Sequence, residues 1–179
     1  MFFTLKTKVL FNIKYMEQIE LTQQQLWREK ISWKIAYGMK PLYMMLRKDL
    51  KPWKTTQEDM ATMPEGTLGN DVAKFLTRHN VTLISKVEWH DVYHVVFGYE
   101  TNIKDELCIQ FVPMGNGRYS PPYLLCNLFA MVCYPEYWGD FYIAYMRGYN
   151  ARRFHGWDFE KMLHLKTSEV RKMMFDKDA

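Results

Sequence analysis

Four side chains that could bind a metal ion lie close together in the stretch EWHDVYHVVFGYETNIKDELCIQ, residues 88–110. His90 and His94 are four residues apart, so on a helix their rings lie on one face within reach of one ion. Asp91 shares part of that face, and Glu106 follows a Gly-Tyr pair. Imidazoles and carboxylates suit Zn²⁺, Fe²⁺, Mn²⁺ or Co²⁺. The spacing predicts a divalent metal site, which Glu106 would close from the next helix.

A second interpretation of these residues stays open. Two histidines four apart are common on helices, and with a nearby aspartate they are often only solvated polar side chains. The surrounding segment is apolar, however, and ionisable groups on a packed helix need partners. Trp89 and Tyr93 could wall a pocket, although aromatic residues of an ordinary core would explain them equally well.

The elements that must position these side chains are predicted to be helices. Apolar spacing predicts a helix over 81–97 that Gly98 ends, then a helix capped by Thr101 or Asn102 that Pro113 ends or kinks. Glycines in the loop 63–70 indicate tight backbone packing. Other helices are expected over 2–16, 22–50 (broken or kinked at Gly38 and Pro41), from Thr55 or Thr56, and over 71–78, 122–134, 135–153 and 167–175. No alternating strand pair is evident, so residues 1–179 predict a single-domain, irregular all-α bundle.

Composition excludes several classes of protein. The 179 residues are 48% hydrophobic and carry a formal charge of only +4 without charge runs, which argues against nucleic-acid binding. Three cysteines without CxxC spacing indicate reduced thiols in a cytoplasmic protein. The first fifteen residues match neither a signal peptide nor a mitochondrial presequence. Lysines beside their apolar stripe leave one alternative, peripheral contact with the inner face of a membrane.

Three segments together resemble the Coq-four family of coenzyme Q biosynthesis proteins. His90-Asp91-x-x-His94, eleven residues and Glu106 match its HDxxH…E signature. MPEGTLGNDVAKFL resembles its Pro-x-Gly-Thr-Leu-Gly segment, and MRGYNARR, Trp157-Asp158 and the EVR of 169–171 resemble the end of its domain. The resemblance covers about residues 58–175, whereas residues 1–57 match poorly.

The resemblance implies an all-α protein that binds a divalent metal through His90, Asp91, His94 and Glu106 and acts on prenylated ring precursors of ubiquinone. The implied reaction replaces the ring carboxylate at C1 by hydroxyl, an oxidative decarboxylation. Arg147, Arg152 and Arg153 are candidates for pairing with a substrate carboxylate or lipid phosphate, beside the alternative of a solvated basic face.

Two other functions stay open at this point. One is a non-catalytic scaffold that binds an isoprenoid lipid and organises other quinone-biosynthesis enzymes, for which the 13 methionines could form an adaptable groove. The other is an ion that only pins two helices. The partners expected are a prenylated aromatic or isoprenoid lipid, other enzymes of the pathway and a second copy of the chain.

Overall fold

The structure is a computed structural model that describes residues 22–46 and 51–176. Within those ranges every regular element is a helix and there is no strand, which confirms the all-α fold class. The chain divides into two compact units, Met1–Met45 and Leu46–Ala179. The single domain expected over 1–179 stays a prediction, and the helix expected over 2–16 lies outside the described residues. No described helix combines the length and apolar run needed to cross a bilayer.

The first unit contributes the helix α2 (Gln23–Leu46). Thr22 begins it: the Thr22 hydroxyl accepts from the Gln25 amide at 3.2 Å, and the Gln25 side chain accepts from the Thr22 amide at 2.8 Å. The helix runs on through Gly38 and Pro41, so the break expected there is wrong. A proline costs one backbone hydrogen bond, which a helix of 24 residues tolerates.

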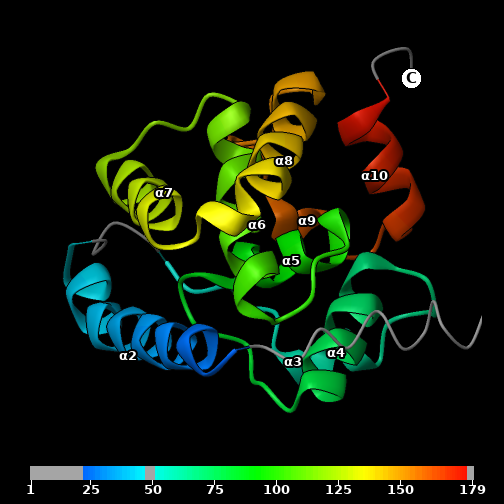
Figure 1. The fold of residues 1–179 in the computed structure, drawn as a ribbon. Coiled ribbons are helices and arrows are strands. Elements are labelled where there is room, and N and C mark those ends of the chain that lie inside the picture. The colour runs from blue at the N-terminus through cyan, green and yellow to red at the C-terminus, as the bar shows by residue number, and fades with distance from the viewer. Residues whose placement is uncertain (1–21, 47–50, 177–179) are drawn as a thin grey trace, which may run out of the picture. The chain divides into compact units, whose positions relative to one another are not determined.

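The second unit is a bundle of short helices (Figure 1). Thr56 and Asn102 cap their helices through side-chain oxygens, and Gly98 ends a helix at φ 70°, as predicted. The helix expected from Val81 begins only at Glu88, because Lys86 adopts a left-handed φ of 72° that no helix accommodates. The helices are α3 (Gln57–Ala61), α4 (Leu68–His79), α5 (Glu88–Phe97), α6 (Ile103–Gly115), α7 (Pro121–Cys133), η1 (Pro135–Tyr137), α8 (Trp138–Asn150), α9 (Phe159–Met162) and α10 (Thr167–Phe175).

The glycines of the loop 63–70 permit close backbone packing, as predicted. The amides of Leu68 and Gly69 donate to the carbonyls of Leu165 and Leu163, both at 2.8 Å. A Cβ atom at Gly69 would lie 3.3 Å from the Leu163 carbonyl oxygen and would collide with the Met63 side chain. The start of α4 is therefore fastened to the segment that follows α9.

Helix α5 is the centre of the second unit. Every residue from Asp91 to Phe97 is buried, as expected of a helix covered on all sides. Tyr93 contacts the rings of Phe97, Phe154 and Phe159 at centroid distances of 4.8, 5.7 and 5.6 Å. Tyr93 thus belongs to the core.

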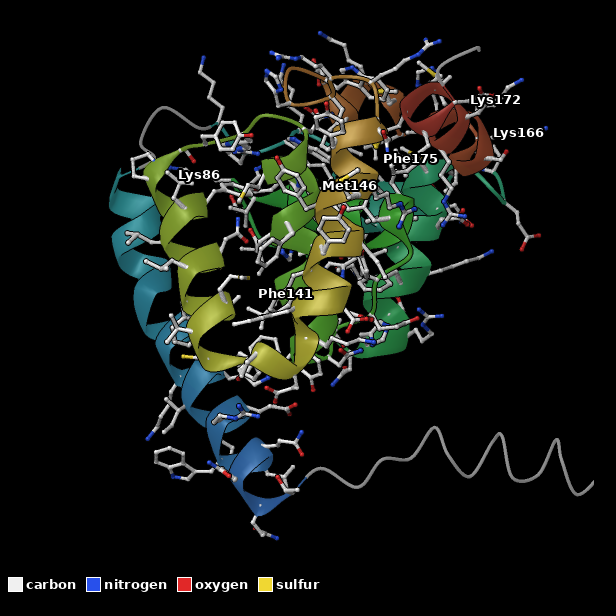
Figure 2. All side chains as sticks on the ribbon, turned by 45° about the horizontal axis from the view of Figure 1, so that its top comes forward. Lys86, Phe141, Met146, Lys166, Lys172 and Phe175 are labelled. Carbon is white, nitrogen blue, oxygen red and sulfur yellow. The ribbon has the colours of Figure 1, made fainter. Side chains whose placement is uncertain are left out.

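Helix α6 packs most extensively on α8. Two glycines let the backbones touch: a Cβ atom at Gly115 would collide with the carbonyl of Tyr145, and one at Gly148 with the carbonyl of Val112. Phe141 of α8 points toward α6, where its ring stacks on Phe111 at 4.5 Å (Figure 2). This contact fixes α6 firmly, and with it every side chain that α6 presents on its other face.

Candidate metal centre

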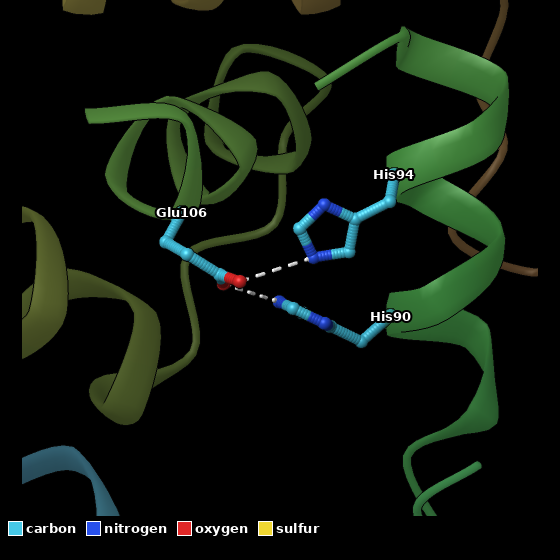
Figure 3. A group of neighbouring side chains, drawn as sticks. All are labelled: His90, His94 and Glu106. Atoms are coloured by element: carbon cyan, nitrogen blue, oxygen red, sulfur yellow. Dashed lines mark ion pairs between the residues drawn. The ribbon is translucent and has the colours of Figure 1, made fainter. Parts of the chain in front are cut away.

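Three of the four predicted ligand residues meet between α5 and α6. His90 and His94 point from α5 toward Glu106 of α6 (Figure 3). His94 Nε2 lies 3.3 Å from Glu106 Oε1, and His90 Nε2 lies 3.5 Å from Glu106 Oε2. The His94 side chain is 3% exposed, against 24% for His90, so the cluster opens to solvent on the His90 side.

Local structure explains why these side chains meet. Gly98 ends α5 in a left-handed conformation, and the Asn102 side chain accepts from the Asp105 amide at 3.0 Å to begin α6. The connection between them is short, so α6 turns back beside α5. Glu106 therefore lies near the start of α6 and faces the two histidines of α5.

The orientation of the His94 ring is fixed from behind. His94 Nδ1 lies 3.1 Å from the Tyr99 carbonyl oxygen, which can only accept, so Nδ1 carries a proton. In the neutral ring the Nε2 lone pair then faces Glu106 and is available to a cation. Phe75 stacks on the same ring with centroids 5.0 Å apart. This nitrogen is held in the form and direction that a metal ligand needs.

The two imidazole–carboxylate distances suit ligand atoms around one ion better than direct hydrogen bonds. Two atoms each about 2.1 Å from a tetrahedral ion are about 3.4 Å apart. The imidazole–carboxylate separations are 3.3 and 3.5 Å, and the three ligand atoms lie within 4.8 Å of one another. Two imidazoles and one carboxylate are also a donor set that binds first-row divalent ions. The residues present fit the predicted ion.

Electrostatics move the pKa values of His94 and Glu106 apart in the absence of an ion. Burial lowers the pKa of His94, but the hydrogen bond and charge of Glu106, with smaller effects of the Tyr99 carbonyl and Asp91, outweigh it, so this pKa lies above its ordinary value. Burial raises the pKa of Glu106, yet its hydrogen bond with His94 and the nearby His90 bring it below the ordinary value. A cation entering the cluster therefore competes with a proton for His94.

Asp91, the fourth predicted ligand, lies on the other side of the His90 ring. Its Oδ1 is 4.0 Å from His90 Nδ1, the nitrogen that faces away from Glu106. Its Oδ2 is buried without a hydrogen-bond partner. A carboxylate behind a metal-binding imidazole commonly orients the ring and raises its basicity. At 4.0 Å Asp91 makes no hydrogen bond with His90, and it lies outside the three converging groups.

One polar side chain that sequence reasoning missed also reaches the cluster. The side-chain amide nitrogen of Gln110 lies 3.5 Å from His90 Nε2. Gln110 follows Glu106 by four residues on α6, so the two share one helix face. That spacing was the signal in the sequence that could have identified it.

Cys126 does not belong to the three ligand side chains that converge in the described part of the chain. Burial, with a smaller effect from the charge of Glu106, raises the pKa of its thiol to about 11.

The three predicted substrate-binding arginines lie elsewhere than in the cluster. Arg147 donates to the Phe97 carbonyl at the end of α5, and its guanidinium lies 4.5 Å from the ring centroid of Phe175. Arg152 and Arg153 are exposed. Arg171 donates to the carbonyls of Val95 and Val96, at 2.6 and 3.2 Å. Two arginines thus cap the helix that carries the histidines, and substrate binding by Arg147, Arg152 and Arg153 stays a prediction.

Two hollows lie in the second unit. A cavity of about 360 Å³ with mixed polar and apolar lining borders His94 from the side of α4 and α10, and Lys74, Arg78 and Arg171 are among its lining residues. An apolar groove of about 400 Å³ lies between α6, α7 and α8. Its lining includes Phe111, Met114, Leu124, Leu128, Met131 and Trp138.

Comparison with known proteins identifies a shared fold. No family model and no curated protein matches this chain. Among solved structures the chain is similar to the crystal structure of a "Putative ubiquinone biosynthesis protein" from Nostoc punctiforme, with a TM-score of 0.57 and 17% sequence identity. The match covers 96% of this chain and 92% of the other. At this identity the likeness concerns the fold alone.

Proposed function

We propose that this chain is a metal-dependent protein of ubiquinone or related isoprenoid quinone biosynthesis. The observation that carries the proposal is the convergence of His90, His94 and Glu106 from two helices at ligand spacing. The sequence resemblance to the Coq-four family supports it. So does the fold shared with the "Putative ubiquinone biosynthesis protein" from Nostoc punctiforme.

The proposed reaction replaces the C1 carboxylate of a prenylated hydroxybenzoate-type precursor by hydroxyl. The bond from C1 to the carboxyl group breaks with release of CO₂, a bond forms from C1 to the oxygen atom of a water molecule, and two protons and two electrons leave, the electrons to an external two-electron oxidant. A bound divalent ion would polarise the substrate oxygens and hold the carboxylate. His94, fixed by the Tyr99 carbonyl, and Glu106 of α6 would hold the ion together with His90, which lies on the solvent-open side of the cluster.

The apolar groove between α6, α7 and α8 fits the hydrophobic part of such a substrate. It shares α6 with the metal cluster, because Phe111 and Met114 follow Glu106 on that helix. Its volume of about 400 Å³ lies within the range of small-molecule sites. A prenyl chain in this groove would be bound by burial of apolar surface.

The alternative is a non-catalytic scaffold that binds an isoprenoid lipid and organises other biosynthetic enzymes. One observation favours it: α7 exposes Leu125, Leu128 and Val132 by 67%, 61% and 71%. A cluster of exposed apolar residues on one helix indicates an interaction surface more strongly than single scattered apolar residues do.

Elemental analysis of protein without a polyhistidine tag tests the proposal first. We expect about one divalent ion per chain, lost in His90→Ala, His94→Ala and Glu106→Ala while helical circular dichroism persists. His164→Ala is the matched control, because His164 is exposed and lies outside the cluster. Absence of an ion after exposure to Zn²⁺, Co²⁺, Mn²⁺ and anaerobic Fe²⁺ would refute the metal-dependent function.

A second measurement separates the enzyme from the scaffold. Turnover of prenylated hydroxybenzoates to the hydroxylated product, abolished in a His90→Ala and His94→Ala double variant, is the result expected of the enzyme. Complementation of a quinone-deficient cell by that double variant at normal protein level would instead establish the scaffold.

A further inference from the structure

Gln110 shares the cluster with the three ligand residues already described. Its amide nitrogen lies 3.5 Å from His90 Nε2. Glu106 Oε2 lies at the same distance from His90 Nε2. The side chain is half-buried and comes from α6, whose position is fixed by the contact with α8. Gln110 therefore approaches the cluster from a rigid support.

Direct hydrogen bonds do not account for these contacts. Toward the Glu106 carboxylate, His90 Nε2 would have to donate a proton; toward the NH₂ group of Gln110, it would have to accept one. A single ring nitrogen cannot do both, and at 3.5 Å both separations exceed the usual 2.7–3.2 Å of a hydrogen bond. The arrangement leaves His90 Nε2 poorly satisfied by protein groups alone.

A cation between these groups accounts for the two separations of 3.5 Å, which are long for hydrogen bonds. The His90 lone pair and the Glu106 carboxylate then both face the ion. Rotation of the Gln110 amide by 180° about its last torsion exchanges nitrogen and oxygen, which places a carbonyl oxygen where the nitrogen lies. That oxygen is at ligand spacing from His90, since two ligand atoms on one ion are about 3.4 Å apart.

We propose that the side-chain oxygen of Gln110 is the fourth protein ligand of the ion held by His90, His94 and Glu106. The inference rests on the proposed metal site. It assigns to Gln110 the place that the sequence resemblance gives to Asp91, which lies behind the His90 ring at 4.0 Å.

The exchange of ligands changes the charge of the centre. With Gln110 the four ligands carry one negative charge, so the ion and its ligands retain a net charge of +1. With Asp91 in the same place the net charge would be zero. The retained positive charge favours an anionic ligand such as a carboxylate at the solvent-open side.

Cobalt substitution of the full-length chain tests this ligand. We expect Gln110→Leu, which keeps the side-chain size but lacks the oxygen, to weaken Co²⁺ and Zn²⁺ binding about 10–100-fold in chelator competition. The visible spectrum of bound Co²⁺ should change, because it reports the number and kind of ligands. Gln110→Glu restores an oxygen and should bind Co²⁺ at least as tightly as the wild type, with a spectrum of similar intensity.

Control variants distinguish ligation by Gln110 from the proposed metal-dependent function. Gln24→Leu changes an exposed glutamine of α2 and should leave affinity and spectrum unchanged. Asp91→Asn should weaken binding while keeping the Co²⁺ spectrum, as for a group that acts through His90. An unchanged spectrum in Gln110→Leu, weakened binding in Gln110→Glu, or a changed spectrum in Asp91→Asn would each overturn the assignment to Gln110. A wild-type chain that binds no ion would overturn the metal site itself.

Discussion

On its α8 side, α6 touches its neighbour backbone to backbone, whereas on its α5 side it meets the neighbour through imidazole, amide and carboxylate groups. The first contact contains two glycines and stacked aromatic rings and leaves no room for a side chain. The second holds polar atoms 3.3–3.5 Å apart. Packing fixes α6, and the fixed helix then presents its polar residues to α5. The geometry of the candidate site thus depends on the contact between α6 and α8, which contains none of the proposed ligand residues.

The largest effect is expected at the tight interface. Gly148→Ala forces a methyl group against the Val112 carbonyl and should lower the free energy of unfolding by about 3 kcal/mol or more. Gly139→Ala is the control on the same helix, because nothing lies within 4 Å of its added Cβ atom, and it should be neutral or stabilising. Urea unfolding followed by circular dichroism measures both. Equal stability of the two variants would show that the backbones of α6 and α8 are not in contact.

The next effect concerns the polar interface. A divalent ion at 100 times its dissociation constant should add about 2.7 kcal/mol to the free energy of unfolding, and a chelator should remove that gain. Hydrogen exchange should slow in the turn Tyr99–Asn102 on binding, while α6 amides facing α8 stay equally protected with and without the ion. His90→Ala should lose both responses. If binding instead raised the hydrogen-exchange protection mainly between α6 and α8, the ion would not act at the interface between α5 and α6.

A smaller effect is expected where α5 ends. Arg147→Ala removes a hydrogen bond to the Phe97 carbonyl and a cation–π contact with Phe175, and should lower the free energy of unfolding by about 1–2 kcal/mol. Arg153 is exposed, so Arg153→Ala should cost less than about 0.5 kcal/mol. Thermal unfolding compares them. If Arg147→Ala keeps full stability but raises KM, Arg147 binds substrate as the sequence suggested.

The smallest effect is a dependence on pH. The pKa of His94 is raised above its ordinary value, so a proton competes with the ion for this ring, and metal affinity should rise with pH until His94 is neutral. Below that pKa, each decrease of one pH unit should weaken metal binding about tenfold. Glu106→Gln removes the charge that raises the pKa, so NMR titration of the ion-free variant should show His94 titrating at lower pH. A His94 pKa unchanged by Glu106→Gln would contradict the pairing.

Local signals predicted much of this fold. The helix caps and the glycine that ends α5 depend on a few neighbouring residues, so the sequence alone predicted Gly98 and narrowed the caps to Thr55 or Thr56 and Thr101 or Asn102; the structure has Thr56 and Asn102. The predicted start of α5 at Val81 was wrong, because apolar spacing continues through a segment that Lys86 interrupts with a left-handed φ of 72°.

The residues of the candidate site were also predicted only in part. Spacing of four residues correctly paired the two histidines. Asp91 follows His90 by one residue, which on a helix is a rotation of about 100°, and this turns its side chain off the shared face. Gln110 was missed because a neutral amide in a sequence does not indicate a metal site. Its contact with His90 is evident only once α5 and α6 lie side by side.

The arginine cap on α5 sets an order of events during synthesis. Arg171 and Val96 are 75 residues apart in the chain, so a ribosome that adds about 5–20 residues per second makes the helix about 4–15 s before it makes the cap. During that interval the nascent chain soon contains every ligand residue of the cluster, while the last carbonyls of the helix that carries the histidines still face water. A chain that stops short of Arg171 keeps all the ligands and lacks the group that fastens their helix, so translation has to reach α10 before the centre is held in place.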